Sequence, residues 1–200
     1  MSFPAIPDGE PPEEELRFIF RSGRLCLQFC ATVGERWCRG FERLLTPSHL
    51  TRWYAEAPVA SVPVPVTGAD LDDARAVRES VYRTAKALIE GQSPAAADEK
   101  IINHAAAPPP VPRIERGTLV LTPGGPDPAA SALSAIARDA IGLFTTADAR
   151  RLRECASPQC GLLFLDLSRP GRRRWCSSDA CGGKARAAAY RQRRVRMAAD

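Results

Sequence analysis

The sequence predicts an α+β protein: a mostly helical N-terminal domain with a small antiparallel sheet, followed by a short module rich in cysteine and arginine. Several stretches place apolar residues three and four positions apart, the spacing of amphipathic helices. A few short segments alternate apolar and polar residues, as strands do. Residues 150–200 hold two close pairs of cysteines. We therefore expect a body at residues 16–149, the module at residues 150–200 and, ahead of both, a flexible acidic and proline-rich arm at residues 1–15.

The first ordered segments predict a β-hairpin followed by a helix. Residues 25–30, LCLQFC, alternate large apolar residues with cysteine and glutamine, which is the period of a strand. The turn FRSGRL ahead of them would pair this strand with Phe18–Phe20. Thr46 is a favourable N-cap and Pro47 suits the first helical position, so a short helix should follow. The proline-rich stretch PVASVPVPVTG after it must be a loop.

Three further helices and a second pair of strands are expected. The clearest helix spans residues 69–91, where Gly91 is a natural stop. Its apolar stripe at helical spacing consists of Leu71, Ala74, Val77, Val81, Ala85 and Leu88. Ser93 and Asp127 should cap two more helices, because a proline suited to the first turn follows each of them. Between these helices, PRIERGTLVLTP predicts two short strands around Arg116 and Gly117.

The net charge of +5 conceals an uneven distribution. Residues 150–200 carry 13 Lys and Arg against 4 Asp and Glu, whereas the preceding residues carry 15 against 19. A basic end of this kind commonly contacts nucleic acid or another acidic surface. No apolar run approaches the roughly 18 residues that a membrane span needs, and MSFPAIPDGEPPEEEL lacks the pattern of a secretory signal. We expect a cytoplasmic protein that does not contact membranes.

Four cysteines near the C-terminus have the spacing of a structural zinc site. Cys155 and Cys160 form one pair, and Cys176 and Cys181 form the other. Zinc binds four thiolates tetrahedrally, and each pair can supply two ligands from one tight turn. The competing interpretation is that the four cysteines are merely buried. It is disfavoured because so small a module buries too little apolar area to fold without a metal ion or another cross-link. We expect one structural Zn²⁺.

The residues between and after the two pairs predict a treble-clef zinc finger. GLLFLDLS is apolar and extended, RPG can turn the chain, and RRRW would return it as the second strand of a hairpin. Ser177, Ser178 and Asp179 are N-cap candidates for a helix through KARAAAYRQRRVRMAA. A four-cysteine site is closed and leaves no position for a catalytic water. The sequence also has no phosphate loop, nucleophile elbow or histidine cluster, so we do not expect an enzyme.

The segment CASPQCGLLFLDLSRPGRRRWCSSDACGGK resembles the finger of the CGNR zinc-finger proteins, which carry an N-terminal ABATE domain and are associated with stress-induced transcription regulation. Besides the four cysteines, the shared residues are Gly161, Phe164, Asp166, Ser168, Arg173, Arg174, Trp175, Ser177 and Gly182. The body is similar more loosely, so the resemblance covers residues 16–197. It implies a regulator whose N-terminal domain senses a signal, with a small-molecule effector that the sequence does not identify.

Two positions depart from the family pattern. The name-giving Asn and Arg of the family fall at Gly183 and Lys184 in this chain. Lysine keeps the charge of arginine but lacks its planar fork, which grips phosphate with two hydrogen bonds. In the body, the family's Asn-Thr reads Ala31 and Thr32, so any role of that asparagine is absent here.

The C-terminal helix would present arginines and one aromatic residue, Tyr190, to a polyanion, most readily double-stranded DNA. The candidate nucleic-acid-binding residues are Arg172, Arg173, Arg174, Lys184, Arg186, Arg191, Arg193 and Arg194. Three alternatives stay open: a merely solvated helix, an RNA-binding protein, and a protein-interaction module with an acidic partner. One finger is small, and a homodimer formed by the body would supply a second copy.

Other residues of the body could serve a ligand or simply pack. The candidates for a ligand pocket, or equally for core and rim, are Arg36, Trp37, Trp53 and Tyr54. Cys26 and Cys30 would lie about 13 Å apart on a strand, too far to form a disulfide or to share a metal, so we expect them to be buried apolar residues. Cys38 is expected near neither of them. His49 and His104 are expected to be ordinary polar residues of helices.

Overall fold

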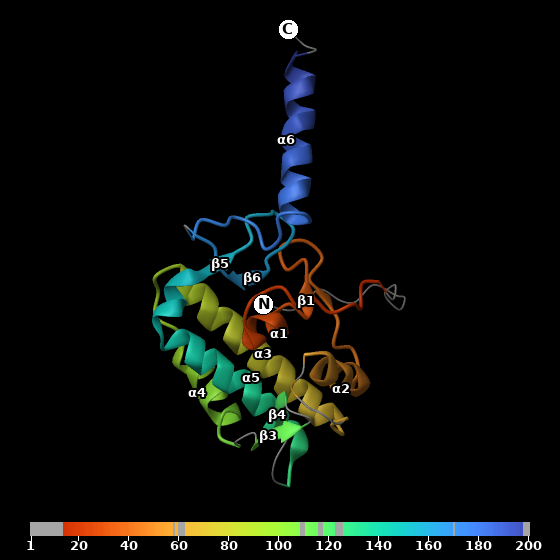
Figure 1. Cartoon of the computed structure of the whole chain (residues 1–200), viewed down its shortest axis with the longest axis vertical. Helices are drawn as coiled ribbons and strands as arrows, with labels where there is room; N and C mark the ends of the chain where they lie inside the picture. Colours follow the sequence, from red (N-terminus) through yellow and green to blue (C-terminus); the bar gives the residue numbers. More distant parts are fainter. Residues whose placement is uncertain are drawn as a thin grey trace.

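The computed structural model describes residues 14–57, 59, 63–108, 111–115, 118–122, 126–169 and 171–197. A helical body carries one long helix, α6, which extends away from it (Figure 1). The helices are α1 (Leu25–Cys30), α2 (Pro47–Glu56), α3 (Gly68–Ile89), α4 (Ala96–Ala105), α5 (Pro128–Phe144) and α6 (Cys181–Met197), with a 3-10 turn, η1, at Ala147–Arg151. The arm predicted at residues 1–15 lies outside the described residues except for Glu14 and Glu15.

The strands form three separate antiparallel pairs within the described part of the chain. They are β1 (Val33–Gly34) with β2 (Phe41–Glu42), β3 (Val111–Glu115) with β4 (Thr118–Thr122), and β5 (Leu152–Glu154) with β6 (Leu163–Leu165). Helix therefore predominates, and the predicted α+β class is confirmed. The β3–β4 pair matches the two strands expected around Arg116 and Gly117, which themselves lie outside the described residues.

The core of the body lies where α1, α3 and α5 pack against one another, with α4 alongside α3 and α5. Helix α3 starts at a capping box, in which Thr67 Oγ1 accepts a hydrogen bond from the Asp70 backbone N–H and Asp70 accepts one from the Thr67 N–H. Its predicted apolar stripe faces the core, and Gly91 follows its end with φ +70°. Asp127 caps α5 as predicted, accepting the Ala130 N–H at 2.9 Å. Helix α2 begins at Pro47, also as predicted.

The strand predicted at residues 25–30 is wrong, because this segment is helix α1. Cys26, Leu27, Phe29 and Cys30 are all buried, since α3, α5 and β6 contact α1. A short segment buried on several sides has no single buried face for its periodicity to report. The expected pairing with Phe18–Phe20 is absent as well, since those described residues form no strand.

The cysteines of α1 are buried, as expected, but their geometry differs from the prediction. Cys26 and Cys30 lie one helical turn apart, about 6 Å along the axis, and not 13 Å. Burial raises the pKa of Cys30 to about 12, so its thiol stays protonated at neutral pH. Cys38 is exposed. One smaller prediction also fails: α4 begins at Ala96, and Ser93 does not cap it.

Candidate metal centre and basic helix

The first cysteine pair lies in the turn of the β5–β6 hairpin. β5 ends at Glu154, and β6 begins at Leu163. Gly161 closes the turn with φ +62°, and the Cys155 N–H donates to the Leu162 carbonyl at 2.9 Å. The predicted hairpin between GLLFLDLS and RRRW is therefore wrong, because β6 pairs with the segment before the cysteines. Residues 172–175 form no strand, although the Ala156 N–H donates to the Arg174 carbonyl at 2.8 Å.

Asp166 explains why the chain turns away after β6. Its buried carboxylate accepts hydrogen bonds from the Ser168 N–H at 3.0 Å, the Ser168 hydroxyl at 2.6 Å and the Arg173 N–H at 2.8 Å. Burial alone would raise the pKa of Asp166, but these hydrogen bonds prevail and lower it. These hydrogen bonds to the ionised carboxylate hold the loop in a turn. The chain thereby returns towards the first cysteine pair, and the second pair lies beside the first.

The four cysteine sulfurs have the geometry of a tetrahedral metal centre. All four ligand atoms lie within 4.8 Å of one another. The Sγ of Cys176 lies 3.8 Å from that of Cys160 and 3.7 Å from that of Cys181. Four zinc–sulfur bonds of about 2.3 Å in a tetrahedron place the sulfurs about 3.8 Å apart. The donor set therefore fits zinc, and the four predicted ligands form a single zinc site.

The thiol cluster also sets the pH dependence of metal binding. Hydrogen bonds from the Cys160 and Cys176 thiols lower the pKa of Cys155, and the hydrogen bonds of Cys160 to Cys155 and to Cys176 raise the pKa of Cys160. Without a cation, the cluster therefore favours the thiolate at Cys155 and keeps the thiols of Cys160 and Cys176 protonated. Zinc must displace these protons, so its affinity falls as the solution becomes acidic.

The second cysteine pair joins the metal centre to α6. Cys181 is the first residue of α6, as the treble-clef prediction requires. Among the three predicted caps, Ser177 supports the turn: its hydroxyl oxygen accepts from the Asp179 and Ala180 N–H groups, and its carbonyl accepts from the Gly182 N–H at 2.9 Å. Zinc at Cys176 and Cys181 thus fixes the start of a helix that would be marginal alone in water.

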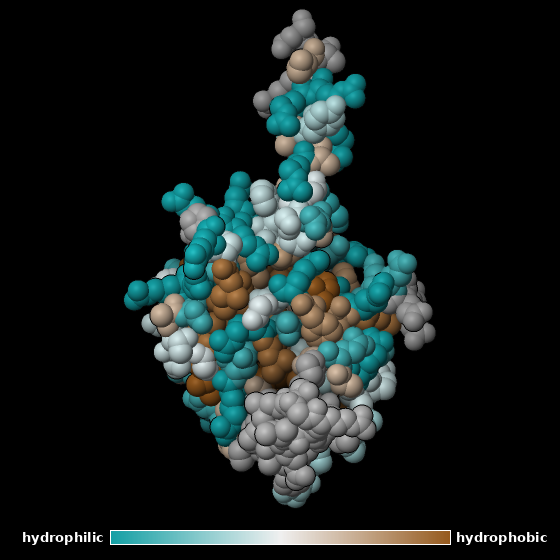
Figure 2. All heavy atoms as spheres, in the orientation of Figure 1, coloured by the Kyte–Doolittle hydropathy of each residue, from teal (hydrophilic) through white to brown (hydrophobic). Residues whose placement is uncertain are grey.

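Exposed basic residues cover α6, and Figure 2 shows a largely hydrophilic surface over the projecting helix. The helix has no acidic residue, and its described basic side chains are Lys184, Arg186, Arg191, Arg193 and Arg194, all exposed. Within the described part of the chain, none of these five forms an ion pair. Arg186 donates to the Ser178 carbonyl at 2.9 Å. The helix thus offers a row of uncompensated positive charge to solvent.

The three arginines before the second cysteine pair differ in their contacts. Arg173 is part of the module's framework, because its guanidinium donates to the Cys176 carbonyl at 2.8 Å and lies over the Phe164 ring. All three arginines are exposed, and Arg174 lies over the Trp175 ring. The structure therefore gives Arg173 a role in holding the metal centre that the sequence did not reveal.

The β5–β6 hairpin fastens the metal centre to the body through both of its faces. Leu152, Leu163 and Leu165 belong to the core of the body, whereas Phe164 packs with the cysteines. The Glu154 carboxylate accepts hydrogen bonds from three body residues: Trp37 at 3.0 Å, Tyr82 at 3.2 Å and Lys86 at 2.6 Å.

The four residues considered for a ligand pocket are not brought together. Trp53 and Tyr54 are fully buried in the core. Arg36 pairs with Glu79 at 2.8 Å and lies over the Tyr82 ring, while Trp37 is 53% exposed. Their places agree with the alternative of core and rim residues.

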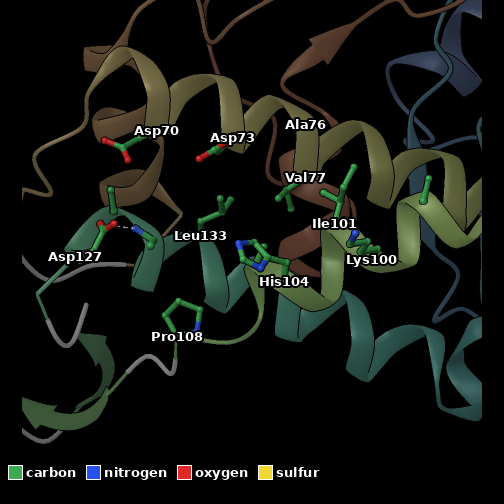
Figure 3. Close-up of a pocket in the computed structure, with 14 residues that line it drawn as sticks. Asp70, Asp73, Ala76, Val77, Lys100, Ile101, His104, Pro108, Asp127 and Leu133 are labelled. Carbon is green, nitrogen blue, oxygen red and sulfur yellow. Dashed lines mark hydrogen bonds between the residues drawn. The ribbon is translucent and has the colours of Figure 1, made fainter.

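A cavity that the sequence did not indicate lies between α3, α4 and α5 (Figure 3). Its volume is about 700 Å³, and its walls are mainly apolar, including Val77, Ile101 and Leu133. Polar groups stand around these walls: Asp70, Asp73 and Asp127, and on α4 Lys100 and His104. The spacing of Asp70, Asp73 and Val77 predicts that they share one face of α3. The sequence does not predict which helices pack against that face.

Two family models match the chain. The model named ABATE, described as "Putative stress-induced transcription regulator", matches residues 23–147. The CGNR zinc finger model matches residues 151–194, which include all four cysteines of the metal centre. No curated protein matches the chain. Among the described residues, no helix combines the length and apolarity that crossing a membrane would require.

Proposed function

Since the chain belongs to the ABATE family and carries a CGNR zinc finger, we propose that it is a transcription regulator that binds double-stranded DNA through α6 and the loop before it. The observation that carries the proposal is the position of α6. The helix extends away from the body, starts at a zinc ligand and has basic but no acidic side chains (Figure 1). The major groove of B-DNA admits an α-helix.

In this proposal, most of the affinity comes from phosphate contacts. Arg191, Arg193 and Arg194 lie within about one turn near the C-terminal end of α6, and Arg172 and Arg174 lie in the loop beside the metal centre. A charge array of this kind binds DNA mainly by releasing counterions. If about six phosphates are engaged, the logarithm of the affinity should fall with the logarithm of the salt concentration at a slope near −5.

The test is a salt titration of DNA binding by the zinc-loaded full chain, followed by fluorescence anisotropy. The double variant Arg193→Gln/Arg194→Gln should flatten the slope by about two and weaken binding at each salt concentration. The matched control is Arg17→Gln/Arg138→Gln, which removes two exposed charges from the body outside the cavity lining and should leave the slope unchanged. A slope near zero, or tighter binding of structured RNA than of duplex DNA, would refute the DNA proposal in favour of a protein or RNA partner.

The signal-sensing role is proposed for the cavity between α3, α4 and α5. Its volume lies within the range of small-molecule pockets, and carboxylates as well as Lys100 and His104 stand around apolar walls. The effector that fits is a small amphipathic molecule with a cationic group for Asp73, which has no hydrogen-bond partner among the described residues.

A thermal-shift screen of amphipathic amines on the full chain would test this role. Ala76→Trp should fill the cavity and abolish any stabilisation, because Ala76 lines it and is exposed. Asp72→Trp, an exposed position of the same helix outside the lining, is the control.

We also propose that the body forms a homodimer, which would present two zinc fingers to DNA. Equilibrium sedimentation of the full chain would detect the dimer.

A further inference from the structure

Arg43 is a buried cation with no carboxylate in ion-pair contact among the described residues, although Glu42, Glu15 and Glu35 attract it from farther away. It is 5% exposed and follows β2. Its Nη1 donates to the Ala31 carbonyl at 3.0 Å, its guanidinium lies over the Phe41 ring, and its Nε has no hydrogen-bond partner. Burial lowers the pKa of Arg43 to about 10, so it remains charged at neutral pH. Charged side chains are almost never fully buried unless they are paired.

Another buried arginine, Arg78, shows how a buried positive charge is balanced elsewhere in this protein. Arg78 donates two hydrogen bonds of 2.7 Å to Glu42 and one of 2.7 Å to Glu79, so two carboxylates balance its charge. The Glu42 carboxylate pairs with Arg78 and Arg75 and accepts the Arg43 backbone N–H, but it forms no ion pair with the Arg43 guanidinium. Among the described residues, no carboxylate lies within ion-pair distance of Arg43.

Arg43 lines a cleft between the body and the zinc module. The cleft has a volume of about 160 Å³ and is also lined by Arg21, Ser157, Gln159 and Lys184. Glu35, the acidic residue among the described residues of the lining, pairs with Arg39 at 2.8 Å. The local sequence keeps room for the guanidinium, because a Cβ at Gly34 would lie 2.8 Å from Arg43 Nη1 and 2.4 Å from the Phe41 ring.

We propose that this cleft is an oxyanion site that binds a phosphoryl group through Arg43, Arg21 and Lys184. A guanidinium presents its N–H groups in a fork that matches phosphate oxygens. Ser157 and Gln159 add neutral hydrogen-bond donors. The volume suits a group of phosphate size and is smaller than the pockets that hold drug-sized ligands.

The phosphoryl group can come from two sources. Ala180, Cys181 and Lys184 of the cleft lie at the start of α6, so a backbone phosphate of nucleic acid lying along that helix is one source; this part rests on the proposed function. A free phosphate or a phosphorylated small molecule is the other. In either case the anion would touch both the body and the zinc module and so couple them.

One competing role must be separated from the proposal. Cys160 and Cys181 line the same cleft, and a zinc ion with four thiolates carries a formal charge of −2. Arg43 could then act only as a counter-charge for the metal centre. In that role it would support zinc affinity, and added phosphate would have no specific effect.

The test measures the melting temperature of the zinc-loaded full chain with inorganic phosphate, against sodium chloride at equal ionic strength. Calorimetric titration with phosphate supplies the dissociation constant. Arg43→Met should weaken phosphate binding at least tenfold and remove its stabilising effect. The matched control is Arg52→Met, since Arg52 also lies over a phenylalanine ring and donates to a backbone carbonyl but lies outside the cleft. It should keep phosphate binding within twofold.

A second variant keeps the proposal testable if the Arg43→Met protein does not fold. Arg21→Gln/Lys184→Gln changes two exposed residues and should weaken phosphate binding several-fold without loss of fold. The proposal fails if the wild-type chain responds equally to phosphate and chloride. It fails also if Arg43→Met lowers the zinc content but leaves phosphate binding unchanged, which is the result expected for a counter-charge alone.

Duplex DNA distinguishes the two sources. If Arg43→Met weakens both phosphate and DNA binding, the site takes a backbone phosphate. If it weakens phosphate binding alone, the site takes a free phosphoryl compound, and the proposal still holds. A wild-type chain that binds phosphate but no DNA would refute the proposed function and leave the oxyanion site intact.

Discussion

Lys86, near the end of the long helix α3, donates a 2.6 Å hydrogen bond to Glu154, the residue directly before the zinc ligand Cys155. Both side chains are about four-fifths buried, at 22% and 19% exposure. Burial opposes the charge of Lys86, but the hydrogen bond to Glu154, together with a second one to Glu90, prevails and raises its pKa. The body and the metal centre are thus joined by a polar contact that is largely shielded from water.

Breaking this contact should destabilise the whole chain. Glu154→Gln removes the charge that Lys86 and two other donors share, and we expect a loss of about 1–3 kcal/mol in the free energy of unfolding. Urea denaturation of the zinc-loaded protein measures it. Glu90→Gln is the control, because Glu90 pairs with the same lysine at 3.0 Å on the exposed surface; its loss should be below about 0.5 kcal/mol. Equal losses in the two variants would contradict the claim.

Gly161 should be intolerant of any side chain. Its φ of +62° disfavours other residues, and a Cβ would lie 2.9 Å from both Arg36 Cβ and Trp37 Nε1. Gly91 has a similar φ of +70° but nothing within 4 Å of the added Cβ. Gly161→Ala should therefore destabilise the protein by about 1 kcal/mol or more beyond Gly91→Ala, since only the first adds a steric clash to the strain. Thermal unfolding of the two variants makes the comparison, and equal shifts would count against the close packing of the metal centre on the body.

The glycine at the family's asparagine position should be replaceable. A Cβ at Gly183 would meet nothing closer than 3.9 Å, whereas one at Gly182 would lie 3.3 Å from the Ser177 carbonyl oxygen. Gly183→Ala should stabilise the first turn of α6 by up to about 1 kcal/mol. Circular dichroism near 222 nm should show more helix with Gly183→Ala and no gain with Gly182→Ala. Loss of helix in Gly183→Ala would mean that this turn needs glycine for a reason not visible in its packing.

Glu79 should contribute to the acid sensitivity of the body. Burial acts to raise its pKa, but the hydrogen bonds of 2.8 and 3.1 Å from Arg36, together with one of 2.7 Å from Arg78, prevail and lower it. A lowered folded-state pKa gives stability that is complete above the unfolded value of about 4.3 and is lost as pH falls through the folded value. Melting temperatures between pH 7 and pH 3 should fall less steeply in Glu79→Gln than in the wild type. Glu99→Gln, an exposed control, should keep the wild-type slope.

The sequence predicted a feature correctly where its residue pattern is typical of a single kind of structure. The spacing of Cys155, Cys160, Cys176 and Cys181 predicted the metal centre, and the structure brings their sulfurs together. The stripe on α3 and the Asp127 cap of α5 likewise predicted long helices, because each had a periodic face and a start signal.

Prediction failed where packing decided the outcome. Residues 25–30 satisfy the alternation of a strand, yet α3, α5 and β6 surround them and they form a helix. The partner of β6 was also misassigned, because either neighbouring segment could pair with it in sequence. In the structure β6 pairs with β5, and the Asp166 carboxylate holds the loop that leads away from β6. The buried, unpaired Arg43 could be recognised only once the chain had folded, since nothing local distinguishes it from a surface arginine.

The central claim is that zinc holds a basic helix where a polyanion can reach it. It is tested most directly by measuring duplex DNA affinity on one sample of full-length protein in three states: zinc-loaded, after chelation, and after zinc is restored. The account predicts tight binding with one zinc per chain, a loss of at least tenfold on chelation together with lower helix content, and recovery with zinc. Equal affinity in all three states would contradict it.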